Sequence, residues 1–187
     1  MCCRFTQRLS WEELHRLADL IGRPRNLAPR YNIAPTSARA ETVAEKPMFR
    51  TAFKTRRCII PAWGFYEWTG KVGAKTPHHF LARSGEPLAF AASWEQAKHP
   101  DTGEPLTSAT IIVGAANNWM NRFHDRQPII LDWRDANAWM RGDDPGALLR
   151  SPPEDSLQEW MVSIHVNKAG IGDYDASLVD PIAAVVP

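Results

Sequence analysis

The second residue of the chain, Cys2, is the side chain whose type and position indicate the most distinctive chemistry. A small residue after Met1 permits removal of the initiator methionine, so we expect the mature chain to begin with Cys2. An N-terminal cysteine carries an α-amine and a thiol on adjacent carbons, with ordinary pKa values of about 8 and about 8.5. This pair condenses with an aldehyde, because the amine forms a Schiff base and the thiol then closes a thiazolidine ring. The alternative is a small, partly buried cysteine, which is the more common role of this residue.

A second candidate is Glu67, which ends an apolar segment and is surrounded by aromatic residues. Strand alternation would place Phe65 and Glu67 on one face, and Tyr66 and Trp68 on the other. A carboxyl group that points inward here would be poorly hydrated, which raises its pKa toward the range useful for proton transfer. An edge-strand glutamate in solvent is the alternative, but the aromatic setting favours a functional role.

Two further groups of polar residues are weaker signals. His124, Asp125 and Arg126 stand in a row before an apolar run. His124 could exchange protons near neutral pH, and Arg126 could bind a phosphate through two hydrogen bonds. A predicted helix over residues 47 to 57 carries a basic stripe that could follow a phosphate backbone, although a solvated helix face is the more common explanation.

Composition limits the class of protein. The chain has 187 residues and a formal net charge of +1, so we expect one domain over residues 1–187 and no general attraction for nucleic acid. The three cysteines show no zinc-ligand spacing, and neither a metal nor an organic cofactor is required. No secretory leader or membrane-spanning run is evident, which predicts a cytoplasmic protein. We also expect it to be a monomer, and to associate with the nucleoid if it binds DNA.

The elements that must position these residues are mainly strands. Ser10 and Glu13 form a capping box before a helix that ends near Gly22, and residues 23 to 42 read as a loop. After the helix at 47 to 57, strands are expected within residues 58–68, 79–83, 88–94, 110–115, 129–131 and 160–166, with a helix capped by Asp132. This order predicts an α+β fold with a curved, mainly antiparallel, barrel-like sheet and flanking helices.

Five stretches together resemble the SRAP (SOS-response-associated peptidase) family, also called abasic-site-processing proteins. They occur in the family's order and extend over most of the chain. The matching stretches are Met1-Cys2-x-Arg4-Phe5, Arg30-Tyr31-Asn32-Ile33-Ala34-Pro35-Thr36, Ala38-Arg39-Ala40-Glu41-Thr42, Gly64-Phe65-Tyr66-Glu67-Trp68 and His124-Asp125-Arg126-x-Pro128.

The resemblance implies covalent capture of abasic sites in single-stranded DNA. An abasic deoxyribose opens to an aldehyde, and the family's N-terminal cysteine condenses with it, which assigns the nucleophile to Cys2. Glu67 is then expected to assist proton transfer at the amine and imine, and His124 to assist sugar opening and reversal.

The same resemblance assigns DNA contacts to five residues. Phosphates would be held by three arginines, an amide would help to shape the pocket at Cys2, and a hydroxyl stands where the family places an asparagine at the sugar. These residues are Arg4, Arg39, Arg126, Asn32 and Ser37.

The chain departs from the family's pattern between two motifs. The family carries several dozen residues between its Asn-Ile-Ala-Pro-Thr and Ala-Arg-Ala-Glu-Thr motifs, which are nearly fused here, and Ser37 stands where the family has asparagine. Two alternatives to abasic-site capture therefore stay open. One is a thiol peptidase that uses Cys2 and His124, either on other substrates or on its own N-terminus alone. The other is a family member that binds single-stranded DNA without chemistry.

Overall fold

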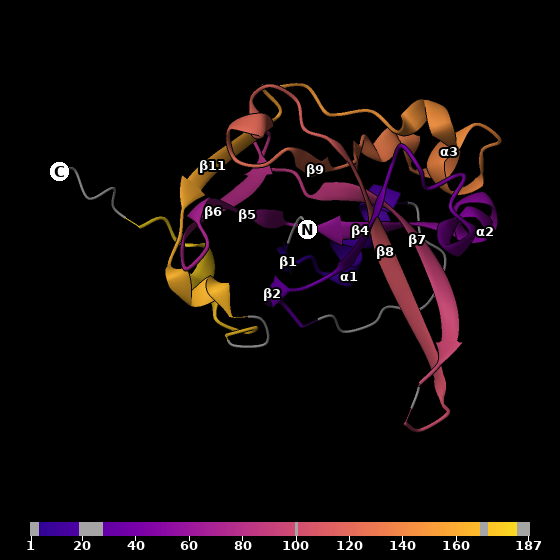
Figure 1. Cartoon of the computed structure of the whole chain (residues 1–187), viewed down its shortest axis with the longest axis horizontal. Helices are drawn as coiled ribbons and strands as arrows, with labels where there is room; N and C mark the ends of the chain where they lie inside the picture. Colours follow the sequence, from indigo (N-terminus) through magenta and orange to yellow (C-terminus); the bar gives the residue numbers. More distant parts are fainter. Residues whose placement is uncertain (1–3, 19–27, 100, 169–171, 183–187) are drawn as a thin grey trace.

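The structure is a computed structural model that describes residues 4–18, 28–99, 101–168 and 172–182 (Figure 1). Its α-helices are α1 (Trp11–Ala18), α2 (Pro47–Thr55) and α3 (Ala136–Arg141). Short 3₁₀ turns are η1 (Met120–Arg122), η2 (Trp133–Asp135), η3 (Pro145–Leu148), η4 (Ile164–Asn167) and η5 (Ala176–Val179). The strands are β1 (Arg4–Gln7), β2 (Arg30–Ile33), β3 (Thr36–Arg39), β4 (Arg57–Ala62), β5 (Gly64–Lys71), β6 (Ala74–Ala82), β7 (Leu88–Lys98), β8 (Pro105–Ala115), β9 (Arg126–Pro128), β10 (Ile130–Leu131) and β11 (Leu157–Met161).

The strands form two sheets that enclose a common core. The first sheet has the order β11-β6-β5-β1-β2. The second has the order β10-β7-β8-β3, and β4 and β9 add to it by pairing with β7 and β8. Among the described strands, β3 and β8 pair in parallel and the other registered pairs are antiparallel. The predicted α+β fold with mainly antiparallel sheets is therefore confirmed.

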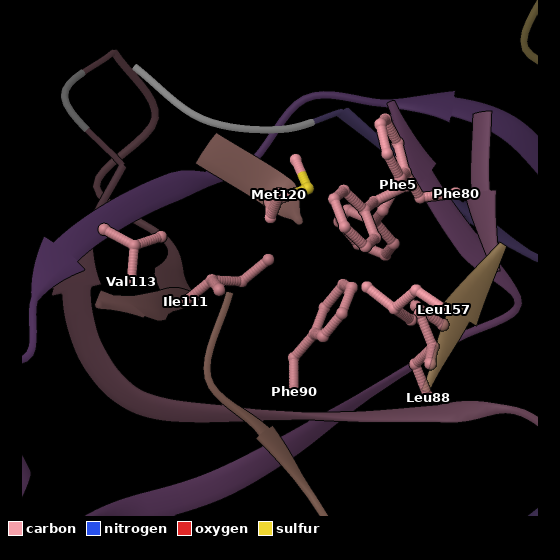
Figure 2. Packing of buried hydrophobic residues seen from close by; sticks show 10 residues of the cluster. Phe5, Phe80, Leu88, Phe90, Ile111, Val113, Met120 and Leu157 are labelled. Atoms are coloured by element: carbon pink, nitrogen blue, oxygen red, sulfur yellow. The ribbon is translucent and has the colours of Figure 1, made fainter. Parts of the chain in front are cut away.

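Large apolar side chains from both sheets fill the space between them. Figure 2 shows Phe80 and Leu157 of the first sheet and Phe90 of the second pointing into the same space. Burial of this kind of side chain contributes roughly 1.5–3 kcal/mol each, which makes this inner cluster the main source of stability. Its buried members are Phe5, Ala62, Phe65, Phe80, Leu88, Phe90, Ile111, Val113, Met120 and Leu157.

The outer faces of the two sheets are covered by different elements. On the second sheet, α2 and α3 supply Phe53 and Trp139 to a second buried cluster with Ala91. On the first sheet, a third cluster joins Tyr66 to Val166 of η4. Side chains alternate between the two faces along a strand. On the inner face of each sheet the apolar core occupies the centre, so polar side chains of that face lie where the core ends.

Local sequence signals explain the helix starts. The Ser10 amide donates to the Glu13 carboxylate at 2.7 Å, and the Glu13 amide donates to the Ser10 hydroxyl at 3.2 Å, which is the predicted capping box. Pro47 opens α2, where a missing amide proton costs nothing.

Two sequence predictions of local structure are wrong. The predicted loop at residues 23 to 42 contains β2 and β3, and the predicted strand at 160 to 166 stops at Met161. Both early strands are short and lie at sheet edges, so they lack the alternating pattern that marks a strand. After β11, the Ser163 hydroxyl accepts from the His165 amide at 3.3 Å and turns the chain into η4.

The hairpin β7–β8 is longer than predicted and extends away from the rest of the molecule at the bottom of Figure 1. Its inner half carries the buried strand residues, whereas residues 95–98 and 105–109 are exposed. No helix among the described residues is long and apolar enough to cross a membrane.

Candidate functional site

Glu67 lies on the inner face of the first sheet, where the core ends. It is 2% exposed and alternates with Phe65, which belongs to the inner cluster, while Tyr66 belongs to the outer one. Burial raises the pKa of the Glu67 carboxyl to about 8, and the charge of Asp125 adds to the rise while that of Lys75 opposes it. A carboxyl group with this pKa can both donate and accept a proton near neutral pH.

His78 is the cross-strand neighbour of Glu67 in the β5–β6 pairing. Directly opposite residues have their Cβ atoms about 4.5–5.5 Å apart, so the two side chains are adjacent on the inner face. His78 Nδ1 lies 3.0 Å from a Glu159 carboxylate oxygen, and Nε2 lies 2.9 Å from the Thr69 hydroxyl. The sequence predicted only that His78 and His79 would point to opposite faces, which the structure confirms.

His124 follows η1 and is brought to the same region by its neighbour Phe123. The Phe123 ring lies 5.0 Å from the rings of both His78 and Phe80, which anchors this loop against the inner face of β6. The Arg126 amide donates to His124 Nδ1 at 2.9 Å, so the neutral ring carries its proton on Nε2. Partial burial lowers the pKa of His124, which favours this neutral form.

One further contact of His124 conflicts with that assignment. Its Nδ1 also lies 3.0 Å from the Asp125 carboxylate, which would attract only a protonated nitrogen. The Asp125 side chain is 78% exposed, so water screens its charge, and we assign the tautomer from the backbone amide.

Glu67 and His124 share charged neighbours. The charges of Asp125 and Lys75 act on both side chains. Charges act in this way only over short distances, so the two proposed proton-transfer residues lie in one region of the fold. The sequence left open whether they converge, since β6 and the long β7–β8 hairpin separate them along the chain.

Three predicted DNA-contact residues share the inner face of the second sheet. Ser37 and Arg39 on β3 are in register with Ile111 and Val113 of the inner cluster. Arg126 on β9 is in register with Ala115, two residues further along β8. The Arg126 guanidinium donates to the Glu41 carboxylate at 2.5 Å, a contact that the sequence did not predict although Glu41 stands within a quoted motif. The structure therefore brings Ser37, Arg39 and Arg126 together around the end of β8.

The other two predicted DNA-contact residues, Arg4 and Asn32, lie on the first sheet, on β1 and β2. The Arg4 guanidinium donates to the Val166 carbonyl and, at 2.8 Å, to the Asn167 carbonyl at the end of η4. Asn32 is 2% exposed; its amide donates to the Lys168 carbonyl at 2.8 Å and accepts from Arg4 at 3.3 Å. These contacts join β1 and β2 to the segment after β11, beside the outer cluster in which Tyr66 packs with Val166.

The predicted basic stripe consists of Arg50, Lys54 and Arg57. Arg50 and Lys54 lie on α2 and are exposed, whereas Arg57 belongs to β4 and is occupied within the protein. The Arg57 guanidinium donates to four backbone carbonyls, those of Phe53, Lys54, Trp139 and Gly142. Arg56, beside the stripe, donates to the Glu95 carboxylate at 3.0 Å. Arg57 thus ties α2 to α3, which weakens the expectation that this face follows a phosphate backbone.

The proposed nucleophile Cys2 lies outside the described residues, which begin at Arg4 on β1. Among the residues that are described, no group of three or more His, Cys, Asp or Glu side chains could hold a metal ion.

Comparison with known proteins places the chain in a family. Residues 36–169 match the model described as SOS response associated peptidase (SRAP). The chain is 38% identical over 138 residues to the abasic site processing protein YoqW of Bacillus subtilis (strain 168), which covers 70% of this chain and 61% of that protein. It is 30% identical over 155 residues to the abasic site processing protein HMCES of Xenopus tropicalis, covering 71% and 46%. The chain thus spans less than two thirds of the length of either relative.

Solved structures share the fold. A protein from Bordetella bronchiseptica superposes with a TM-score of 0.70 at 21% identity, covering 87% of this chain and 100% of that one. A protein from Bacteroides thetaiotaomicron gives a TM-score of 0.70 at 23% identity, covering 79% and 66%. The family match over residues 36–169 shows that the chain belongs to the SRAP family.

Proposed function

We propose that this protein captures ring-opened abasic sites in single-stranded DNA covalently, through the amine and thiol of Cys2 after removal of Met1. The observation that carries the proposal is Glu67, a buried carboxyl group whose pKa is raised to about 8 in the region that also holds His124. Abasic-site processing is also the activity named for the relatives YoqW and HMCES.

The position of β1 supports the role of Cys2. Arg4 is in register with Tyr66, the residue before Glu67. Two residues of extended chain reach at most about 7 Å, so covalent geometry alone keeps the Cα of Cys2 within that distance of the Cα of Arg4. The strand that follows Cys2 in the sequence therefore pairs with the strand that carries Glu67.

The proposed reaction needs only proton transfers besides bond formation to Cys2. The amine attacks C1′ of the sugar aldehyde to give a carbinolamine, and loss of water gives an imine. The thiol of Cys2 then adds to the imine carbon, and its proton ends on the nitrogen of the thiazolidine. Glu67 is suited to protonate the departing hydroxyl group and to accept a proton from the thiol.

His124 is assigned to the sugar. With Nδ1 accepting the Arg126 amide, the Nε2–H group can donate a hydrogen bond to the ring oxygen, which takes up the proton released by the C1′ hydroxyl group through solvent as the deoxyribose opens. Arg39 and Arg126, on the facing sheet, are assigned to the phosphates on either side of that sugar. Ser37 shares their face and is assigned to the sugar itself.

The test uses purified protein whose N-terminus has been verified by mass and a single-stranded oligonucleotide with one abasic site. We expect a covalent adduct that survives denaturing electrophoresis and is lost in Cys2→Ser. Cys3→Ser and Cys58→Ser are matched controls that each remove another thiol, and both should retain the adduct. A chain that still carries Met1 should form none, because its Cys2 amine is acylated.

Other outcomes would favour the alternatives. Binding without any adduct from a mature Cys2 N-terminus would point to a DNA-binding protein without chemistry. Retention of Met1 in His124→Ala, together with no adduct from the unmodified protein, would point to a peptidase instead.

A further inference from the structure

Glu41 joins the two arginines that the proposed function assigns to DNA phosphates. It comes two residues after Arg39 on β3, and its carboxylate accepts a hydrogen bond from Arg126 on β9 at 2.5 Å. The charge of Arg39 also acts on the Glu41 carboxyl. Since β3 and β9 lie on either side of β8, one carboxylate connects arginines from two different strands.

The exposure of this ion pair argues against a role in folding stability. The Glu41 side chain is 48% exposed and that of Arg126 is 26% exposed. An exposed ion pair of this kind contributes only about 0–1 kcal/mol to the free energy of folding. Its main effect is therefore geometric, because it restricts a long side chain that would otherwise sample many rotamers.

A carboxylate at this place should at first sight oppose the proposed function. A negative charge beside arginines that receive a polyanion repels it, and removing that charge should tighten binding. The opposite holds if the carboxylate keeps Arg126 oriented, because an ordered guanidinium loses less entropy when it binds a phosphate. The sign of the effect therefore separates the two possibilities.

We propose that Glu41 is a positioning residue that holds Arg126 beside Arg39 in the arrangement that receives the phosphates of a bound strand. The proposal rests on the proposed DNA-binding function, but not on the covalent chemistry of Cys2. Glu41 acts through Arg126, so its contribution should vanish when Arg126 is removed.

The experiment measures equilibrium binding of the full chain to a fluorescent single-stranded oligonucleotide without an abasic site, over a series of salt concentrations. Four variants are compared with the unmodified protein: Glu41→Gln, Arg126→Ala, the double variant, and Glu45→Gln. Glu45, four residues after Glu41, has an exposed side chain and undergoes the same change of charge, so it is the matched control.

We expect Glu41→Gln to weaken binding by about 3- to 10-fold, the coupling usual for side chains in contact. The slope of log affinity against log salt should become shallower, as expected when one phosphate contact of about 0.7 counterions is lost. Glu45→Gln should bind as tightly as the unmodified protein or slightly more tightly, and Glu41→Gln should add nothing to Arg126→Ala.

The proposal is overturned if Glu41→Gln tightens binding as much as Glu45→Gln does, or if its effect adds fully to that of Arg126→Ala. Absence of salt-dependent binding by the unmodified protein would overturn it as well. A protein that binds in this way but forms no adduct at an abasic site would contradict the covalent function and leave the role of Glu41 intact.

Discussion

The two faces of the β5–β6 strand pair bury titratable side chains in contrasting ways. On the inner face, Glu67 lies opposite His78, whose two ring nitrogens contact Glu159 and Thr69. On the outer face, His79 is 1% exposed among aromatic rings, and neither of its ring nitrogens has a partner among the described residues.

Burial shifts the pKa values of Glu67 and His79 in opposite directions. It raises the pKa of Glu67 to about 8 and lowers the pKa of His79 to about 3, because in both cases the charged form loses hydration. The inner face thus holds a group that can exchange protons near neutral pH, whereas the outer face holds a histidine that stays neutral. Burial alone does not make a catalytic residue; the pKa that results must match the working pH.

The largest expected effect follows from Glu67→Gln, which keeps the shape of the side chain but cannot transfer a proton. We expect the rate of adduct formation at an abasic site to fall by about 10²-fold or more, the usual contribution of general acid–base catalysis. Initial rates measured from pH 6 to 9 should show a step near pH 8 from Glu67 that the variant lacks, whereas the pH dependence that comes from the amine and thiol of Cys2 should be common to both proteins.

His79→Phe is the matched control on the other face and should retain the rate of the unmodified protein. A Glu67→Gln variant as fast as the unmodified protein would remove the functional distinction between the two faces.

A second prediction concerns folding stability as a function of pH. The pKa of Glu67 is raised from 4.5 to about 8, so its stabilising contribution is present below pH 4.5 and is lost as pH rises to 8. The pKa of His79 is lowered from 6.5 to about 3, so its contribution is present above pH 6.5 and is lost as pH falls to 3. Each group changes the free energy of unfolding by at most about 1.4 kcal/mol per pH unit.

Urea unfolding at several pH values tests this opposition. Between pH 4.5 and 6.5, a rise in pH lowers the contribution of Glu67 to the free energy of unfolding and raises that of His79. Glu67→Gln should therefore become more stable as pH rises through this window, and His79→Phe should become less stable. Equal pH dependence of both variants would contradict the assignment of opposite shifts.

The smallest effect is expected from His78→Phe, which keeps a ring beside Phe123 and Phe80 but removes both hydrogen bonds of the imidazole. An apolar neighbour should desolvate Glu67 further and raise its pKa above about 8, so the step in the rate profile should move to higher pH. The lost hydrogen bonds should lower stability by about 1 kcal/mol each.

Thr69→Val is the control, because it removes only the Nε2 contact and leaves the imidazole in place. If His78→Phe leaves the step at its original pH, His78 serves the packing of the inner face and has no influence on Glu67.

Close packing explains why the outer histidine stays without a partner. A Cβ atom at Gly64 would lie 2.5 Å from His79 Nε2 and 2.5 Å from the Phe80 carbonyl oxygen, so no side chain fits at that position. The His79 ring is also held by Tyr66 and Trp160, whose centroids lie 5.0 and 5.6 Å away. Such a site leaves no room for a polar partner.

Much of the architecture follows from local sequence signals. The capping box at Ser10, the proline that opens α2 and the alternation of Phe65, Tyr66 and Glu67 all predict what the structure contains. These features depend on residues close in sequence, where spacing determines which side chains meet. The family, too, was evident from motifs in the sequence.

The tertiary structure decided which basic residues are occupied by contacts within the protein and which residues surround Glu67. Arg57 and Arg126 are both arginines near apolar runs, yet one caps backbone carbonyls while the other pairs with Glu41. The register of β5 with β6 decides that His78 lies beside Glu67, and the packing of Phe123 decides that His124 joins them. Such contacts connect residues far apart in the chain, and they depend on strand register and loop packing, which residue spacing alone does not specify.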